Sequence, residues 1–109
     1  KLILKTQESI FLFNTDDIVH CESDGSYSVF NTVDEQKVVV SKILKDYDNM
    51  LSGSGFLRVH RSHLINLKHI KRFDKGDGGY LIMSNGIHVP VSSSGRERLL
   101  DLFDEIGNE

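Results

Sequence analysis

The stretch FLRVHRSHLIN, residues 56–66, joins two short β-rich runs through a basic turn. Side chains alternate between the two faces of a strand, so positions 56, 58 and 60 share one face of the first run. Because Leu57 and Val59 on the other face are apolar, we expect them to be buried. Arg58 and His60 would then project from the opposite side of the strand.

Positive charge is concentrated in residues 56–73. This segment contains five Lys or Arg residues, three histidines and no acid, whereas the rest of the chain has 8 basic and 16 acidic residues, a formal charge of −8. The segregation predicts one basic face on an otherwise acidic body, which would orient the protein toward a polyanion. The basic residues of the segment are Arg58, Arg61, Lys68, Lys71 and Arg72.

Short β-rich runs separated by turn residues occupy most of the chain and predict a mainly β fold. Asn85-Gly86 predicts a hairpin with a two-residue type I′ turn, which needs positive φ at both residues. Pro90 cannot donate to a strand ladder, so its strand should be an edge strand. The expected strands are 2–5, 9–13, 18–23, 27–33, 36–40, 56–60, 63–66, 70–74, 80–83 and 87–91.

Two segments have the apolar spacing of amphipathic helices. The first covers residues 43–51, with Ser41 as its expected N-cap, and ends at the Gly53-Ser54-Gly55 run. The second covers residues 95–106, where Ser94 and Glu97 form a capping-box pattern. We therefore expect two short helices, one near the middle of the chain and one near its end.

A shift of 52 residues superposes the second half of the sequence on the first. The turn at Asp24-Gly25 then falls on Gly76-Asp77, and the helix after Ser41 falls on the helix after Ser93. If the similarity is not due to chance, each half is a set of strands that ends in a helix. Neither half could bury its apolar face alone, so the two halves would fold together.

The residues form no recognisable catalytic or metal pattern, and we expect no enzyme, no cofactor and no metal. Ser, His and Asp are present without a G-x-S-x-G elbow, and the histidines lack the spacing of a zinc site. His60 and His63 could share a metal, or one could pack while the other faces solvent or a phosphate. The single cysteine, Cys21, is expected to be a small buried hydrophobic residue and fits a reducing compartment.

The length of 109 residues predicts one domain, covering 1–109. Because the chain starts at Lys1 rather than Met, we expect it to be excised from a longer protein. No apolar run approaches the roughly 20 residues that cross a bilayer, and no segment resembles a signal peptide. We expect no membrane contact and a cytoplasmic location.

Three motifs in register resemble the LytTR DNA-binding domain family. They are F-L-R-V-H-R-S-H-L-I-N at 56–66, I-V-H-C-E-S-D-G-S-Y at 18–27 and V-P-V-S at 89–92. The resemblance implies an elongated stack of small antiparallel sheets with two short helices. It also implies an output domain of a bacterial transcriptional response regulator in a two-component system. Such a domain follows an N-terminal receiver domain and binds double-stranded DNA sequence-specifically through loops.

The resemblance implies three contact loops, at 25–28, 60–62 and 92–96. Arg61 is the expected base reader, because a guanidinium can fork onto the O6/N7 edge of guanine. The third loop departs from the family, which commonly has arginine where this chain has Ser93 and Ser94; Arg96 could substitute. The candidate DNA-contacting residues are Ser26, Tyr27, Ser28, Arg58, His60, Arg61, Ser62, Lys68, Ser93 and Arg96.

The charge pattern also supports a second hypothesis from another class. The basic face could belong to a protein-interaction module that docks on an acidic partner domain. In either case we expect a monomer in isolation, with any pairing on DNA supplied by another part of the regulator.

Overall fold

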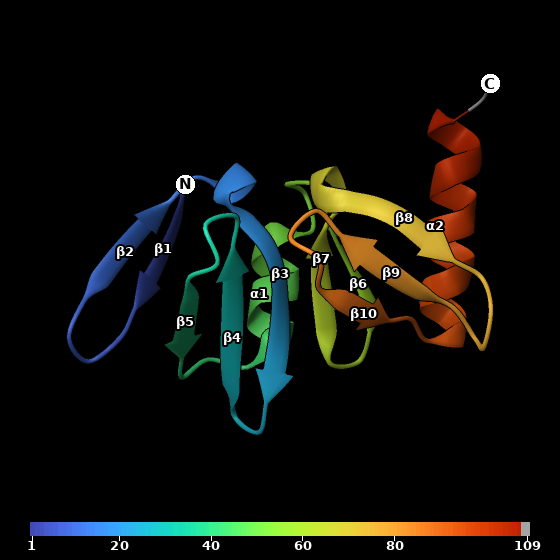
Figure 1. Ribbon diagram of the computed structural model, residues 1–109. Coiled ribbons are helices and arrows are strands. Elements are labelled where there is room, and N and C mark those ends of the chain that lie inside the picture. Colours follow the sequence, from blue (N-terminus) through green and yellow to red (C-terminus); the bar gives the residue numbers. More distant parts are fainter. Residues whose placement is uncertain (108–109) are drawn as a thin grey trace.

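The computed structural model describes residues 1–107, which form three antiparallel sheets and two α-helices (Figure 1). The molecule is elongated, with extents of 45 × 26 × 24 Å. The two-stranded sheet pairs β1 (Leu2–Lys5) with β2 (Ile10–Phe13). The five-stranded sheet has the order β5 (Lys37–Val40), β4 (Tyr27–Thr32), β3 (Ile18–Asp24), β7 (His63–Asn66) and β6 (Phe56–His60). The three-stranded sheet has the order β10 (His88–Pro90), β9 (Tyr80–Met83) and β8 (Ile70–Asp74).

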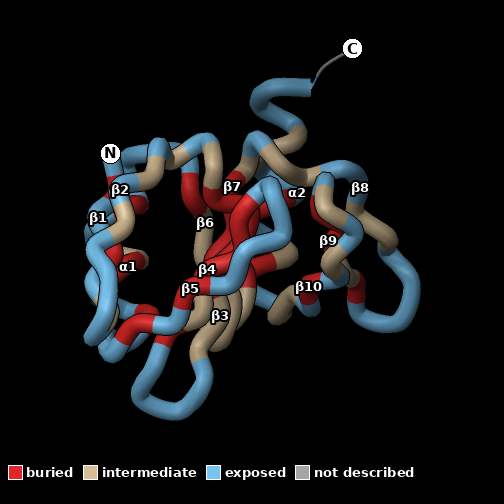
Figure 2. The backbone as a smooth tube through the Cα atoms, turned by 60° about the vertical axis from the view of Figure 1, so that its left-hand side comes forward, coloured by how far each residue is buried: buried red, intermediate tan, exposed pale blue. Residues whose placement is uncertain are grey.

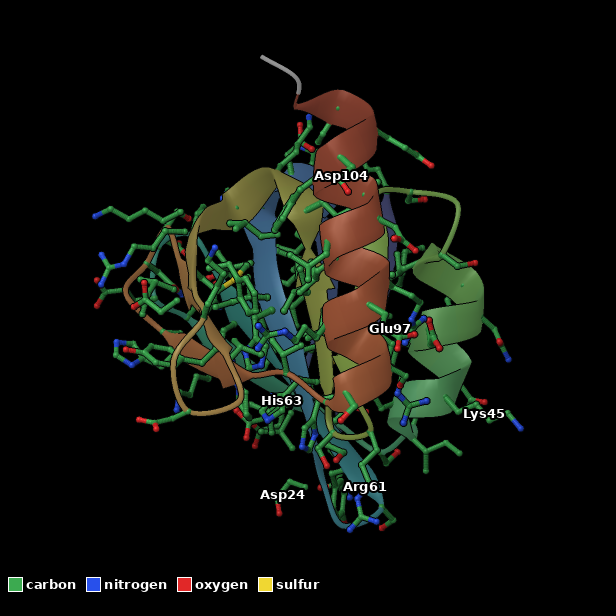
Figure 3. All side chains as sticks on the ribbon, turned by 90° about the vertical axis from the view of Figure 1, so that its right-hand side faces the viewer. Asp24, Lys45, Arg61, His63, Glu97 and Asp104 are labelled. Carbon is green, nitrogen blue, oxygen red and sulfur yellow. The ribbon has the colours of Figure 1, made fainter. Side chains whose placement is uncertain are left out.

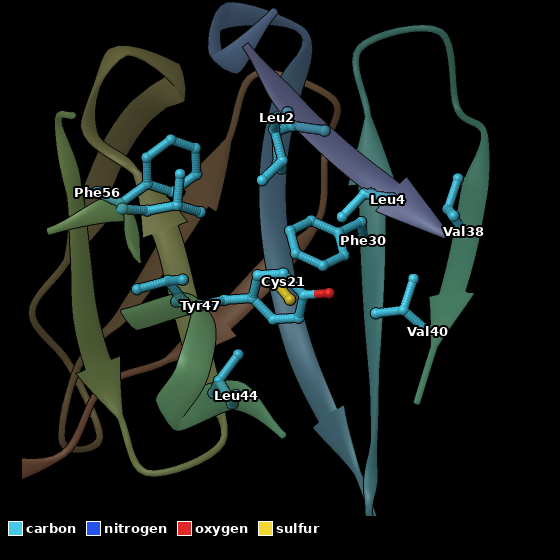
Figure 4. Packing of buried hydrophobic residues seen from close by; sticks show 12 residues of the cluster. Leu2, Leu4, Cys21, Phe30, Val38, Val40, Leu44, Tyr47 and Phe56 are labelled. Atoms are coloured by element: carbon cyan, nitrogen blue, oxygen red, sulfur yellow. The ribbon is translucent and has the colours of Figure 1, made fainter. Parts of the chain in front are cut away.

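Both faces of the five-stranded sheet carry a core, the first over all five strands and the second over β3, β7 and β6. One core joins it to β1 and to α1 (Leu44–Leu51), as Figure 4 shows. There the ring of Tyr47 packs edge-on against Phe30, with 4.7 Å between centroids. Cys21 lies fully buried in this core, as predicted, and burial raises the pKa of its thiol.

The second core lies on the other face of the same sheet. It packs against the three-stranded sheet and against α2 (Ser93–Ile106), with Val59, Ile65 and Leu99 fully buried. Figure 2 shows buried backbone concentrated in the central strands, while the connecting loops are mostly exposed. The predicted stack of small sheets therefore holds together because its middle layer is covered on both sides.

The predicted duplication is visible in the order of the elements. The series β1, β2, η1 (Thr15–Asp17), β3, β4, β5, α1 recurs as β6, β7, η2 (Leu67–His69), β8, β9, β10, α2. A register shift in β3, between Ile18 and His20, recurs between Ile70 and Arg72 in β8, at the 52-residue spacing expected from the sequence. The first half supplies three strands of the central sheet and the second half two, so the halves share one core.

The strand β6 contains a β-bulge that breaks the expected alternation. The pairing with β7 shifts register between Arg58 and His60, so Val59 is the extra residue. His60 consequently pairs with His63 and turns to the face opposite Arg58. The prediction that Arg58 and His60 share one face is therefore wrong. The face of Phe56 and Arg58 is also not open to solvent, because α1 covers it and Phe56 is buried.

The carbonyl oxygen of the bulged Val59 anchors the start of α2. It accepts hydrogen bonds from the backbone N–H of Ser92 at 2.9 Å and from the Ser92 hydroxyl at 3.2 Å. The Ser92 side chain in turn accepts a hydrogen bond from Gly95 N–H, so Ser92 is the N-cap. The predicted cap at Ser94 is wrong by two residues, because the Val59 carbonyl fixes the helix start further upstream.

Two other local predictions also differ from the structure. Ser41 is not the N-cap of α1, which begins at Leu44 without a side-chain cap. The Ser28 hydroxyl donates a hydrogen bond to Lys42 O, which holds the segment after Ser41 outside the helix. The hairpin between β9 and β10 forms at the predicted place, but of its two central residues only Gly86 has positive φ. The N–H of Gly86 donates to Met83 O, and Met83 N–H donates to Ile87 O. The loop therefore contains residues 84–86, one more than the two-residue loop of a type I′ turn.

Pro90 lies on β10, an edge strand, as predicted. Neither described helix combines the length and apolar character that a membrane crossing requires.

Replacing Gly95 by alanine should destabilise the protein. A Cβ at this position would lie 2.0 Å from Val59 O, so α2 must shift away from β6. We expect Gly95→Ala to lower the free energy of unfolding by about 1–3 kcal/mol, although alanine favours a helix by about 1 kcal/mol. Urea unfolding followed by circular dichroism measures the change.

Gly53→Ala is the matched control, because a Cβ at Gly53 meets nothing within 4 Å. It should change the free energy of unfolding by less than about 0.5 kcal/mol. Equal effects of the two substitutions would contradict the close contact between α2 and β6.

Candidate nucleic-acid interface

The three predicted contact loops converge at one end of the central sheet. The turn after β3 lies beside the β6–β7 turn, since Ser23 N–H donates to Ser62 O at 3.0 Å. The residues before α2 are fixed to β6 through Ser92 and Val59. Figure 3 shows Asp24 and Arg61 at the same tip, below the first turn of α2. Antiparallel pairing thus brings together loops that are far apart in the sequence.

Arg58 holds the β6–β7 turn in position. Its guanidinium donates to Arg61 O and lies 3.9 Å from the Asp48 carboxylate of α1. The His60 ring adds a second constraint, because its Nδ1 accepts a hydrogen bond from Ser62 N–H at 3.0 Å. Arg58 is half-buried and occupied by these contacts, so it positions the turn rather than presenting its charge freely.

Arg61 stands exposed at the tip of this turn and borders a hollow of about 340 Å³. Arg98 on α2 also lines the hollow and donates to Arg58 O. Sequence reasoning missed Arg98, although its position one turn after Ser94 on an exposed helix face could have indicated it. The lining residues are Arg58, His60, Arg61, Ser92, Ser94 and Arg98.

Two candidate contact residues are engaged inside the protein. Ser28 is fully buried and its hydroxyl donates to Lys42 O at 2.7 Å, which contradicts its assignment as a DNA contact. Arg96 lies over the Phe73 ring and donates to Gly78 O at 3.3 Å, toward the loop after β8. It therefore cannot take the place of the missing arginine without leaving these partners. Ser26, Tyr27 and Ser93 remain exposed.

The five basic residues of 56–73 do not form the single face that was predicted. Lys68 follows β7 while Arg61 precedes it, so the length of that strand separates them, and Lys68 pairs with Asp16 at 3.0 Å. Arg72 lies on another sheet and pairs with Asp74, whose pKa this hydrogen bond lowers. These basic residues are separated because the chain crosses the sheet between them.

A buried polar chain lies directly under the β6–β7 turn. His20 is only 1% exposed; its Nδ1 is 3.1 Å from Asn31 Nδ2, and its Nε2 is 2.9 Å from His63 Nδ1. If the amide of Asn31 donates to Nδ1, the Nε2–H of His20 donates to His63. The His60 ring meets the His63 ring edge-on, with centroids 5.2 Å apart.

Burial, and to a smaller extent the charge of a neighbouring histidine, lowers the pKa of both His20 and His63 to about 4. Both rings are therefore neutral at pH 7.

A family model described as the LytTr DNA-binding domain matches residues 8–104. The chain belongs to the LytTR family. A solved LytTr DNA-binding domain, from a methyl-accepting/DNA response regulator of Bacillus cereus, has a TM-score of 0.79 to this structure. It is 27% identical, and 94% of each chain is covered. The predicted fold, an elongated stack of small antiparallel sheets with two helices, is confirmed.

Two curated relatives match this chain over 94% of its length but differ in name. Sensory transduction protein LytT of Bacillus subtilis (strain 168) is 34% identical over 105 residues, which cover 94% of this chain and 43% of the relative. The heme-containing CO-sensing transcriptional regulator RcoM 2 of Paraburkholderia xenovorans (strain LB400) is 32% identical over 106 residues, covering 94% and 39%. The chain thus spans less than half the length of these relatives.

The neutral histidines should make this LytTR domain less stable in mild acid. An unfolded histidine has a pKa of about 6.5, whereas His20 and His63 titrate at about 4 in the folded state. Between these values the unfolded state binds more protons, so stability falls as the pH falls. The slope should reach about 1.4 kcal/mol per pH unit for His20, and less for the part-exposed His63.

Urea unfolding at several pH values between 7 and 5 measures this slope. His63→Gln should reduce it, whereas His88→Gln, which removes an exposed histidine, should not. A free energy of unfolding that stays constant across this range would contradict the buried neutral pair.

Proposed function

We propose that residues 1–109 form a single domain that binds double-stranded DNA sequence-specifically and has no catalytic activity. The observation that carries the proposal is the convergence of three loops around the exposed Arg61, where strands β3, β7 and β6 are packed on both faces. A rigid scaffold that presents loops at one end suits groove contacts, because little conformational entropy remains to be lost on binding.

Arg61 is the proposed base reader. Its backbone is held by Arg58 and by the hydrogen bond between Ser23 and Ser62, while its side chain stays exposed. A guanidinium that emerges from a fixed turn can donate two parallel hydrogen bonds to guanine in the major groove. Ser26 and Tyr27, at the neighbouring turn, are the proposed contacts of the first loop.

Phosphates are the proposed ligands of the α2 end of the surface. Ser93 and Ser94 occupy the first turn of this 14-residue helix, where N–H groups and the helix dipole favour an anion. Arg98 adds a full positive charge beside them. We propose Arg98 in place of Arg96 as the cation of the third loop, and we do not retain Ser28, Arg58 or Lys68 as DNA contacts.

We also propose that the domain is the output part of a longer cytoplasmic transcriptional regulator. The relatives support this, since each is more than twice the length of the matched segment. An N-terminal receiver domain is the proposed partner, as the family resemblance implies. The name of RcoM 2 indicates a different input, so the sensing part is not fixed by the LytTR domain.

Removing the Arg61 side chain should reduce sequence preference. On an operator recovered by selection from random duplexes, Arg61→Ala should weaken binding by about 1–3 kcal/mol and flatten the preference at one base pair. Lys68→Ala is the control, because it removes a charge from the same segment at the far end of β7. Fluorescence anisotropy measures both, and unchanged affinity of Arg61→Ala for operator and scrambled DNA would exclude the assigned role.

Replacing Arg98 should change the salt dependence rather than the preference. Arg98→Gln should weaken binding to specific and scrambled duplexes alike. It should also reduce the magnitude of the slope of log K against log salt by about 0.9, the value expected for the loss of one phosphate contact. Arg96→Gln on the same helix should leave the slope unchanged, because that guanidinium packs on Phe73. Identical slopes for wild type and Arg98→Gln would show that Arg98 does not contact a DNA phosphate.

Binding to a mixed-sequence duplex at low salt distinguishes the proposed DNA-binding function from the alternative, a protein-interaction module. Failure to bind such DNA at all would favour a module that docks on an acidic protein.

A further inference from the structure

A β-bulge in β3 and the pairing of β3 with β7 bring three metal-ligand side chains together beneath the β6–β7 turn. In β3 the register shifts between Ile18 and His20, which turns His20 to the same face as Val19. Glu22 lies two residues further along that face and pairs across the strands with His63. One ligand atom from each of His20, Glu22 and His63 lies within 4.8 Å of the other two.

We propose that His20, Glu22 and His63 bind a zinc ion. Two imidazoles and one carboxylate form a donor set that zinc uses with one open position for water. Hard cations such as Mg²⁺ prefer ligand sets made only of oxygen, so they do not fit this site.

The geometry of the two rings needs little change. Two nitrogens at zinc bond lengths of 2.0–2.1 Å in a tetrahedral site are about 3.3 Å apart, and His20 Nε2 and His63 Nδ1 are already 2.9 Å apart. Within residues 1–107 no ion pair involves Glu22, so its part-exposed carboxylate can turn toward the metal.

Zinc binding also requires a consistent placement of protons. The proton between His20 Nε2 and His63 Nδ1 must leave that position, and a tautomer with Nδ1–H on His20 accommodates it without charge. The amide oxygen of Asn31 then accepts a hydrogen bond from this Nδ1–H after a 180° turn of the side-chain amide, whose nitrogen lies 3.1 Å from Nδ1 in this structure. Such a partner on the second ring nitrogen is usual for a metal-binding histidine.

The bound ion would fasten β3 to the first residue of β7. His63 directly follows Ser62, whose carbonyl accepts the Ser23 N–H, so zinc would strengthen the connection beneath the turn that carries Arg61. The site is independent of the proposed DNA binding, since it requires no contact with a nucleic acid.

Titration of the metal-free, untagged protein with Co²⁺ tests the site. We expect one Co²⁺ per chain, visible absorption bands of a nitrogen- and oxygen-ligated ion, displacement by Zn²⁺ but not by Mg²⁺, and a higher melting temperature with metal. No saturable Co²⁺ or Zn²⁺ binding by the wild type would overturn the proposal.

Three variants distinguish binding at this site from non-specific binding of the metal ion to surface histidines. His63→Gln should abolish the Co²⁺ spectrum, and Glu22→Gln should weaken binding at least about tenfold, the lower limit seen even for outer-shell residues. His88→Gln, at an exposed histidine stacked on Tyr80, should bind as the wild type does. Circular dichroism checks folding; if His63→Gln does not fold, Glu22→Gln decides. Unchanged binding by Glu22→Gln, or equal loss in His88→Gln, would refute the site.

Discussion

The contact between the Val59 carbonyl and the start of α2 is the constraint on which the arrangement of this LytTR domain depends. A bulge leaves this carbonyl outside the β6–β7 ladder, and a buried carbonyl without a partner would be costly. Ser92 supplies two hydrogen bonds, and Gly95 allows the helix backbone to approach. The same contact joins the three-stranded sheet to the central sheet through β10 and α2. It therefore sets both the stacking of the layers and the position of the third loop.

The bulges also give the central sheet a polar region within an apolar core. Regular alternation would place His60 on the side of α1, and His20 beside Ile18 in the first core. The two register shifts turn both rings to the second face, where they meet His63. The polar chain from Asn31 through His20 to His63 ends immediately under the β6–β7 turn. Stability of the sheet and order of the turn are thereby linked through hydrogen bonds that need neutral imidazoles.

Charge and rigidity have separate roles at this end of the molecule. The chain carries a formal charge of −3, so attraction to a polyanion has to come from local cations rather than from the whole body. Arg61 lies in a turn and Arg98 on a helix, and both elements attach to β6. The guanidinium of Arg58 donates to the carbonyl of Arg61, and the carbonyl of Arg58 accepts from the guanidinium of Arg98. The backbone of Arg61 and the guanidinium of Arg98 are thus both held by Arg58, while the side chain of Arg61 stays exposed.

The sequence alone determined the strands, the two helices, the hairpin at Gly86, the repeat and the position of Arg61 in a turn. These features follow from local periodicity, from turn residues, and from motifs that lie within a few residues of one another. Only the tertiary structure decided that Arg58 and Arg96 are engaged in packing, that Ser28 is buried, and that Arg98 borders the surface. It also decided that His20, Glu22 and His63 meet, because strand pairing across 43 residues and the bulge in β3 control which face each side chain occupies. A single inserted residue reverses the alternation, and nothing in the local pattern of IVHCES or FLRVH marks where the insertion falls.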